Sequence, residues 1–190
     1  MQEITYITGN KLKFVVAQKM LEPFEIRLVH QKLETPEIQS TDVGEVALYS
    51  AKWASELLKK PVIVTDAGYY IEALNGFPGP FIKYINQWLT SADILKLMDG
   101  QKNRKVEARD GLAYCEPGKE PVVFFDVFKG TISLSAGKKG MTPINEVFIP
   151  EGYDKVESDI GWEEMLKFWS NRQGWPKLAE YLRDKNHERS

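Results

Sequence analysis

Residues 62–81, VIVTDAGYYIEALNGFPGPF, contain the strongest strand signal and the leading candidate residue of the chain. The run Val62–Val64 is apolar and β-branched, which is typical of a buried strand. The strand is predicted to stop at Asp66, and Gly68 then frees the backbone to turn. Open α/β sheets bind their ligands beyond the carboxyl ends of the strands, where this carboxylate would lie. Asp66 is therefore the leading candidate for chemistry, and the alternative is that it only caps the following turn or helix.

Composition indicates a globular chain of one large domain or two closely joined lobes. The 190 residues are 43% hydrophobic and 27% charged, and no apolar run approaches the roughly 18 residues of a membrane span. The first residues lead directly into the apolar run Ile4–Ile7, without the basic segment and long apolar core of a signal peptide. We therefore expect a cytoplasmic protein with no membrane partner.

Charge and residue types exclude several functions. A formal net charge of -2 supplies no broad field for duplex nucleic acid. Cys115 is the sole cysteine, so no internal disulfide can form, and in a strand-like run it is expected to pack rather than react. The two histidines are His30 and His187, and the second lies in a polar tail expected to fray, which disfavours a Ser-His-Asp triad or a His-rich zinc site. Carboxylates and lysines remain, and they suit Mg²⁺ and phosphate.

The first elements have a phosphate-binding arrangement. Ile4–Ile7 is predicted to be a strand, Thr8–Asn10 a turn and Lys11–Leu21 a helix. Free amides at a helix N-terminus and the helix dipole both favour an anion there, and Lys11 and Lys13 add positive charge. The tetrapeptide Thr-Gly-Asn-Lys is neither a Walker A nor a dinucleotide-binding motif, so a polar capped helix start is the alternative.

Alternating strands and helices continue to the end of the chain. Further strands are predicted at residues 25–29, 105–114, 122–132 and 147–150, and helices at 41–60, 161–170 and 176–182. Residues 81–97 are predicted to be helical, with a first part up to Leu89 and then a shorter turn toward Gly100. The second strand runs parallel to the first if the helix between them is a right-handed crossover. Glu37 lies in the loop ahead of the helix at 41–60, where it is either a metal ligand or a solvated loop residue. We find no internal repeat, low-complexity segment or linker.

Six pieces, in this order and spacing, resemble the inosine triphosphate pyrophosphatase family. They are TGNKLK at 8–13, PEIQ at 36–39, Asp66, IEALNGFPGPFIK at 71–83, VFIPEGYDK at 147–155 and SNR at 170–172. The resemblance covers nearly the whole chain and is more specific for the fold than for the substrate. It implies an α/β protein in which a long twisted mixed sheet, flanked by helices, joins two lobes around a central cleft. Residues 1–190 would form a single domain, usually as a homodimer.

The resemblance also implies a reaction, the Mg²⁺-dependent hydrolysis of a nucleoside triphosphate with a non-standard purine base to its monophosphate and pyrophosphate. Asp66 and Glu37 would bind the metal, and Asp66 would also orient or deprotonate the attacking water. Substrate-binding positions implied by the family are Thr8, Gly9, Asn10, Lys11, Lys13, Ala67, Asn145, Lys167, Asn171 and Arg172, with Lys13 also catalytic. Such a site must neutralise the pyrophosphate leaving group and place water in line with the α phosphorus.

Several positions depart from the family pattern. Thr65 stands where family members usually have Glu, Ala67 where they have Ser or Thr, and Ser50 where they have Lys. In the base-recognition loop Asn145 stands where the family has Asp, and Asn171 replaces the His of Ser-His-Arg. In the same loop Thr142 stands where the family has an aromatic residue that could stack on a purine.

These departures gather at the base and partly at the phosphates. Asn145 can donate as well as accept hydrogen bonds, whereas an ionised Asp only accepts, so the base preference is predicted to be altered or relaxed. Two other hypotheses stay open. One is a catalytically silent relative that binds a nucleotide, which the changes at Thr65, Ser50 and Asn171 favour. The other is a nucleic-acid-binding module, which the net charge and the core spacing of the aromatic residues disfavour.

Overall fold

The computed structural model describes residues 2–188, and the side chains up to residue 185. The chain divides into two compact units. Unit 1 comprises Met1–Asp66, Asp110–Asp126 and Ser170–Ser190, and unit 2 comprises Ala67–Arg109 and Val127–Trp169. These two units correspond in number to the two lobes that we expected. The cleft between the lobes stays a prediction, and so does the single domain over residues 1–190.

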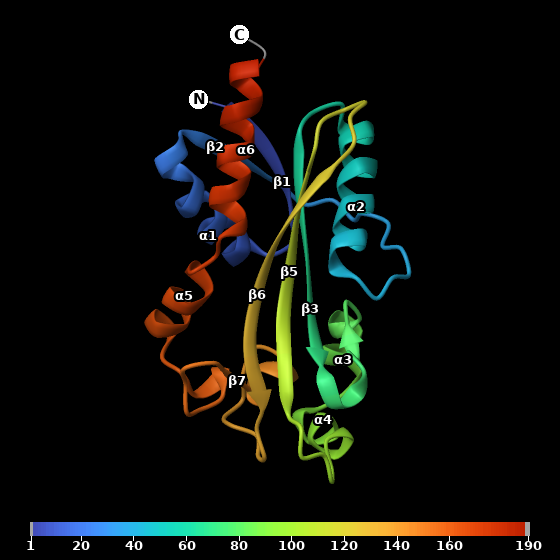
Figure 1. Cartoon of the computed structure of the whole chain (residues 1–190), viewed down its shortest axis with the longest axis vertical. Helices are drawn as coiled ribbons and strands as arrows, with labels where there is room; N and C mark the ends of the chain where they lie inside the picture. Colours follow the sequence, from blue (N-terminus) through green and yellow to red (C-terminus); the bar gives the residue numbers. More distant parts are fainter. Residues whose placement is uncertain (1, 189–190) are drawn as a thin grey trace. The chain divides into compact units, whose positions relative to one another are not determined.

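Seven strands form one mixed sheet (Figure 1). They are β1 (Gln2–Ile7), β2 (Ile26–Gln31), β3 (Val62–Ile71), β4 (Pro78–Gly79), β5 (Lys105–Cys115), β6 (Val122–Ile132) and β7 (Phe148–Pro150). The strand order is β2-β1-β3-β5-β6-β7, and β4 pairs with β3. β1 is parallel to β2 and β3, whereas the pairs β3–β4 and β6–β7 are antiparallel. The predicted α/β class with a mixed sheet is confirmed.

Six α-helices are assigned within residues 2–188. They are α1 (Lys11–Leu21), α2 (Val43–Leu58), α3 (Ile82–Trp88), α4 (Ser91–Leu97), α5 (Trp162–Ser170) and α6 (Gly174–Glu188). Short 3-10 turns lie at Glu22–Phe24, Glu72–Leu74, Pro143–Glu146 and Glu157–Asp159. Among the described residues no helix combines the length and the apolar character required to span a membrane.

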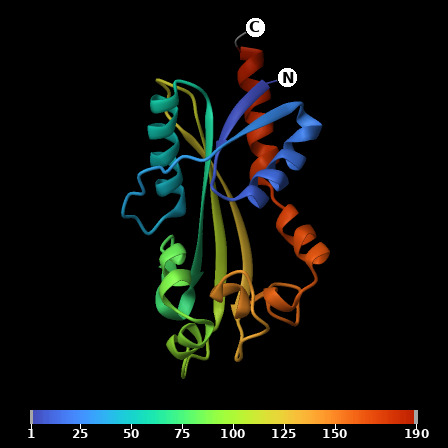
Figure 2. The ribbon, with the colours of Figure 1, turned by 180° about the vertical axis from the view of Figure 1, so that it is seen from behind.

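Unit 1 has helices on both faces of its strands, as Figures 1 and 2 show from opposite sides. Consecutive side chains of a strand point to opposite faces, so each strand supplies both cores. On one face Ile63 and Leu112 pack with residues of α1 and α6. On the other, Val62 and Val64 pack with Ala51 and its neighbours on α2. This alternation explains why the apolar run of β3 is continuous, because both of its faces are covered.

Unit 2 has its own core. Buried residues of α3, α4, β5 and β6 pack there with the chain around β7, and the largest fully buried side chains include Phe148 and Ile132. Phe168 and Trp169 at the end of α5 pack against this core, with ring centroids 5.1 and 4.9 Å from that of Phe128. These three aromatic residues therefore contribute to packing.

The prediction that the first central strand stops at Asp66 is wrong, because β3 continues to Ile71. Gly68 does not make a turn. A Cβ built on it would lie 2.7 Å from the carbonyl of Gly79, so glycine is required where β4 folds back onto β3. Pro78–Gly79 thus supplies a short strand that lengthens the pairing of β3.

Other element boundaries differ by a few residues. The residues predicted to be helical at 81–97 form two helices, since Leu89 is extended and Thr90 begins α4 with a capping box to Asp93. The last helix begins at Gly174 and includes Pro176 in its first turn, where a proline lacks no helical hydrogen bond. It continues to Glu188, so the backbone of the tail expected to fray is helical to that residue.

Candidate functional site

The turn between β1 and α1 is a capped helix start. Asn10 Oδ1 accepts hydrogen bonds from the backbone N–H of Leu12 at 2.9 Å and of Lys13 at 3.3 Å. Thr8 Oγ1 accepts one from the backbone N–H of Asn10 at 3.1 Å. The structure therefore gives Asn10 the capping role that the sequence left as an alternative. The capped turn is also compatible with anion binding, because it leaves Gly9 and Lys11 exposed.

Strand β2 holds this turn in place, a role that the sequence did not reveal. His30 Nε2 donates to the carbonyl oxygen of Thr8 at 2.8 Å, and the backbone N–H of Thr8 donates to Gln31 O at 3.2 Å. The rings of His30 and Phe14 are 5.0 Å apart, so the imidazole also packs on α1. The signal available in the sequence was that His30 is one of only two histidines. Its position in β2, at the register of Tyr6, brings it to the turn.

The two predicted metal ligands occupy different surroundings. Asp66 lies within β3, half-buried, with its Oδ2 atom inaccessible to solvent. Glu37 is exposed in the loop before α2. Ser50 is buried on α2, and its hydroxyl donates to the carbonyl of Pro36 at 3.3 Å, so it fastens the loop that carries Glu37. A group of three or more His, Cys, Asp or Glu side chains arranged to hold a metal is absent from the described residues. The predicted Mg²⁺ site requires only the two carboxylates of Asp66 and Glu37.

Thr65, which precedes Asp66, bonds to a buried tyrosine. Its hydroxyl lies 2.8 Å from the hydroxyl of Tyr6 on β1, so this pair links β1 to β3 next to the candidate carboxylate. Tyr6 is 1% exposed, and burial raises the pKa of its phenol to about 12. The phenol is therefore neutral at physiological pH. It supplies Thr65 with a fixed hydrogen-bonding partner rather than a charge.

Two strand carboxylates, which the sequence reading missed, hold the segment before α6. Arg172 Nη1 donates to Asp110 Oδ2, and both side chains are mostly buried, at 17% and 12% exposed. Asp126 accepts from the backbone N–H of Gln173 at 2.7 Å and of Gly174 at 3.1 Å, which caps α6. For Asp126 the available signal was an acidic residue among the apolar neighbours of β6. Asn171, between these anchors, is exposed.

Unit 2 contributes Ala67, Asn145 and Lys167. Ala67 is half-buried in β3 and Lys167 is exposed on α5. Asn145 is engaged within the protein: its oxygen accepts from Thr142 and its nitrogen donates to Glu157 Oε2 at 2.8 Å. Glu157 is 8% exposed, and its burial raises the pKa of the carboxyl. An Asp at position 145 would face this carboxylate directly, so the buried Glu157 accounts for the Asn found there.

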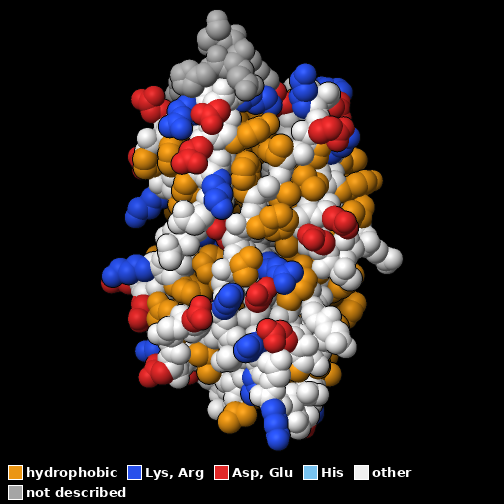
Figure 3. All heavy atoms as spheres, in the orientation of Figure 1, with side chains coloured by type: hydrophobic (Ala, Val, Ile, Leu, Met, Phe, Trp, Pro, Cys, Tyr) orange, Lys and Arg blue, Asp and Glu red, His pale blue; other side chains and the backbone are white. Residues whose placement is uncertain are grey.

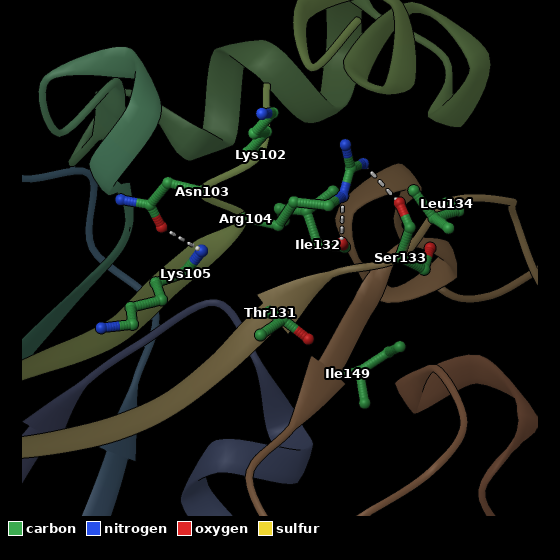
Figure 4. A pocket seen from close by; sticks show the side chains of 9 residues that line it. All are labelled: Lys102, Asn103, Arg104, Lys105, Thr131, Ile132, Ser133, Leu134 and Ile149. Atoms are coloured by element: carbon green, nitrogen blue, oxygen red, sulfur yellow. Dashed lines mark hydrogen bonds between the residues drawn. The ribbon is translucent and has the colours of Figure 1, made fainter. Parts of the chain in front are cut away.

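A surface hollow of unit 2 lies at a different place. It has a volume of about 640 Å³ and is lined by Lys102, Asn103, Arg104, Lys105, Thr131, Ile132, Ser133, Leu134 and Ile149 (Figure 4). None of these is a predicted site residue. The guanidinium of Arg104 donates to the carbonyls of Ile132 at 2.7 Å, Ser133 at 2.5 Å and Met98 at 3.2 Å. Arg104 therefore uses three of its five N–H groups to join backbone carbonyls within unit 2.

Each unit thus holds part of the predicted set. Unit 1 carries Glu37, Asp66, Asn171, Arg172 and the residues 8–13, and unit 2 carries Ala67, Asn145 and Lys167. Within unit 1 the turn, Thr65 and Arg172 are each fixed by buried or half-buried partners, which suits residues that must hold a ligand in one geometry. That the members from the two units meet on one ligand stays a prediction.

Comparison with known proteins identifies relatives over almost the whole chain. The Ham1 family matches residues 4–180. A dITP/XTP pyrophosphatase of Methanopyrus kandleri is 37% identical over 183 residues, which are 96% of this chain and 97% of that protein. A dITP/XTP pyrophosphatase of Methanosarcina mazei is 38% identical over 182 residues, 96% and 98% of the two chains.

The fold is likewise shared with solved structures. A HAM1 protein from Coxiella burnetii superposes with a TM-score of 0.82 at 21% identity, covering 97% of this chain and 100% of that one. The Ham1 protein of Staphylococcus aureus gives a TM-score of 0.80 at 20% identity over the same shares. Fold, length and sequence agree, and the chain belongs to the Ham1 family.

Proposed function

We propose that this chain hydrolyses a nucleoside triphosphate to the nucleoside monophosphate and pyrophosphate. The observation that carries the proposal is the 37% identity, over nearly the full length of both chains, to a protein named dITP/XTP pyrophosphatase. The relative from Methanosarcina mazei carries the same name. Retention of the Thr8–Lys13 turn, with its backbone fixed by Asn10 and His30, supports the same reaction.

The phosphate end of the substrate would be held by unit 1. Cleavage between the α and β phosphorus atoms leaves charge on the departing pyrophosphate, which has to be neutralised. Lys11 and Lys13 supply positive charge at the start of α1, and the helix dipole adds to it. Thr8 and Gly9 shape the turn. Lys13 is half-buried, which suits it to stabilise the leaving group rather than attract anions at long range.

Asp66 and Glu37 would hold Mg²⁺, since oxygen ligands from carboxylates are those this ion prefers. When bound, the ion would supply positive charge that polarises the phosphoryl oxygens. Asp66 orients the attacking water and accepts its proton. Thr65 and Tyr6 fix the strand beside this carboxylate.

The nucleoside end would be held by Ala67, Asn145, Lys167, Asn171 and Arg172. With Thr142 in place of an aromatic residue and Asn145 in place of Asp, we expect a base preference different from the inosine and xanthosine forms named for the relatives. An alternative is a nucleotide-binding relative without turnover. The replacement of three family side chains by Thr65, Ser50 and Asn171 favours that alternative.

One assay separates these functions. Purified protein is incubated with each of the common and non-standard nucleoside triphosphates, with and without Mg²⁺, and monophosphate and pyrophosphate are quantified. We expect both products in equal amounts, dependence on Mg²⁺, and loss of at least about 100-fold in kcat for Asp66→Asn, because its amide cannot accept the proton. A nucleotide-induced rise in melting temperature with no product would instead establish the silent binder. Turnover of inosine and xanthosine triphosphates far above all others would contradict the altered preference.

We also propose that the protein is a cytoplasmic homodimer. The exposed rings of Tyr84 and Trp88 on α3, at 36% and 72% exposed, are apolar surface that a second copy could cover. Light scattering during size-exclusion chromatography should give twice the chain mass of 21.8 kDa at micromolar concentration. A mass equal to one chain at all concentrations would refute the dimer.

A further inference from the structure

The carboxamide of Asn145 is held in one orientation by its neighbours. Its oxygen accepts from the backbone N–H of Thr142 at 3.1 Å and from the Thr142 hydroxyl at 2.5 Å. One N–H of its nitrogen donates to Glu157 Oε2 at 2.8 Å. A carboxamide oxygen has two lone pairs and its nitrogen two hydrogens. Both lone pairs and one hydrogen are therefore used inside the protein.

Glu157 prevents the carboxamide from turning over. Its other oxygen, Oε1, accepts from the indole N–H of Trp169 at 2.8 Å, so both carboxylate oxygens receive a donor. Turning the carboxamide of Asn145 would place its oxygen against Glu157 and its nitrogen against the backbone N–H of Thr142, so the bonds to those two groups would be lost. Because Glu157 is 8% exposed, water is not available to compensate that loss. The second N–H of Asn145 is left as the only group of this side chain that can still bond to a ligand.

We propose that Asn145 selects a base that presents a hydrogen-bond acceptor, because Thr142 and Glu157 leave it one N–H to donate and no lone pair to accept. This inference rests on the proposed function, in which Asn145 contacts the base. An ionised Asp in the same place would present only acceptors and would select a base N–H. Glu157 is accordingly a positioning residue, which sets the polarity of Asn145 without touching the substrate.

The test is to exchange the amide and the carboxylate between positions 145 and 157. In the double variant Asn145→Asp, Glu157→Gln, the Gln side chain accepts from Trp169 through its oxygen and donates to the Asp through its nitrogen. Thr142 still donates to the Asp. Net charge and the internal bonds are kept, but the free position of residue 145 changes from a donor to an acceptor.

The readout is the ratio of kcat/KM for ITP to that for ATP. The two bases differ by exchange of donor and acceptor at neighbouring edge atoms, since adenine has an unprotonated N1 and an amino group where hypoxanthine has N1–H and a keto oxygen. We expect the ratio to change by about 10-fold or more between wild type and double variant, the effect of one mismatched hydrogen bond. The direction of the change tells whether N1 or the 6-substituent faces residue 145. A ratio within about twofold of the wild type overturns the inference.

Unit 2 contains a matched control. Asn103 Nδ2 donates to Glu72 Oε2 at 2.9 Å, the same type of pair at the surface. Asn103→Asp with Glu72→Gln makes the same chemical exchange away from all the proposed site residues, and it should leave the ratio unchanged. A similar change of the ratio in this control would overturn the inference, because it would show that the effect does not depend on position 145.

Stability and binding complete the test. Asn145→Asp alone puts two carboxylates in contact, so its melting temperature should fall, and the double variant should recover most of the loss; an unchanged melting temperature for the single variant would overturn the geometry.

Nucleotide-induced melting shifts for ATP and ITP are measured in parallel. Turnover with an unchanged ratio rejects the inference and keeps the proposed function. If no turnover is seen but the order of the ATP and ITP melting shifts is reversed between wild type and double variant, the proposed function is rejected and the inference is kept. If there is no turnover and no melting shift, both are rejected.

Discussion

At the scale of single residues, Arg172 depends on Asp110 for its position. The pair joins a β5 carboxylate to the segment before α6, and both side chains are mostly buried. Removing one partner from a buried ion pair leaves an uncompensated charge. We therefore expect Asp110→Asn to lower the free energy of unfolding by about 3–5 kcal/mol and to raise KM for the nucleotide more than it lowers kcat. Urea unfolding and steady-state kinetics measure both. Unchanged stability would show that Asp110 does not hold Arg172 in solution.

Tyr6 makes stability depend on pH in the alkaline range. Its folded-state pKa of about 12 lies above the ordinary tyrosine value of 10.0, so the folded protein keeps the phenolic proton more tightly than the unfolded chain. The associated stability is complete below pH 10 and is lost as the pH rises to about 12, on the order of 3 kcal/mol for a shift of this size. Tyr6→Phe should abolish this part of the decline, as measured by denaturation at pH 9 to 11 against wild type, since Phe has no proton to lose. Parallel curves for the two proteins would contradict the prediction.

At the scale of elements, the cap of α1 can be separated from the anion-binding role that we propose for the turn before it. Asn10→Ala removes the oxygen that accepts from Leu12 and Lys13, so it should cost about 1 kcal/mol and also raise KM. Asn10→Asp keeps the cap and favours the helix dipole, but its charge repels a phosphate. We expect its stability to equal or exceed that of wild type and its KM to rise more than for Asn10→Ala. A lower KM for the Asp variant would exclude phosphate from this turn.

The strand β4, which pairs with β3, is the element that the sequence did not predict. It depends on Gly68, because a Cβ there would lie 2.7 Å from backbone atoms of Gly79. Gly68→Ala should therefore lower the melting temperature by several degrees, whereas the same change at the exposed Gly9, where nothing lies within 4 Å of an added Cβ, should have little effect. Thermal denaturation of both variants tests this, and equal melting temperatures would disprove the close approach.

At the scale of the whole molecule, charge disfavours nucleic acid as a partner. The formal net charge is -2, and Figure 3 shows Lys, Arg, Asp and Glu side chains interspersed over the face it presents. Association with DNA is driven largely by the release of counterions from phosphates by clustered positive charge. We expect no change in the fluorescence anisotropy of a labelled duplex or single strand at about 150 mM salt. Binding that weakens steeply with added salt would revive a nucleic-acid function.

Sequence alone indicated the α/β class and most of the element order, and it offered the capped turn before α1 as one of two interpretations. These follow from local signals: apolar runs with a period of two or 3.6, and side chains that bond to a backbone a few residues away. It also placed the bounds of α1 and β6 as the structure has them. The extension of β3 past Asp66 was missed, because Gly68 indicates a turn locally but in the fold permits close approach of another strand.

Only the tertiary structure decided which residues hold the candidate site. Asp110 and Asp126 reach Arg172 and the start of α6 from distant strands, and Glu157 reaches Asn145 across a loop. Such partners are far apart in the sequence, so neither periodicity nor local propensity predicts them. Because they are buried, their polar groups must form hydrogen bonds with one another. The sequence could say that Asn stands at position 145; the buried carboxylate beside it decides which hydrogen bond that Asn can still make.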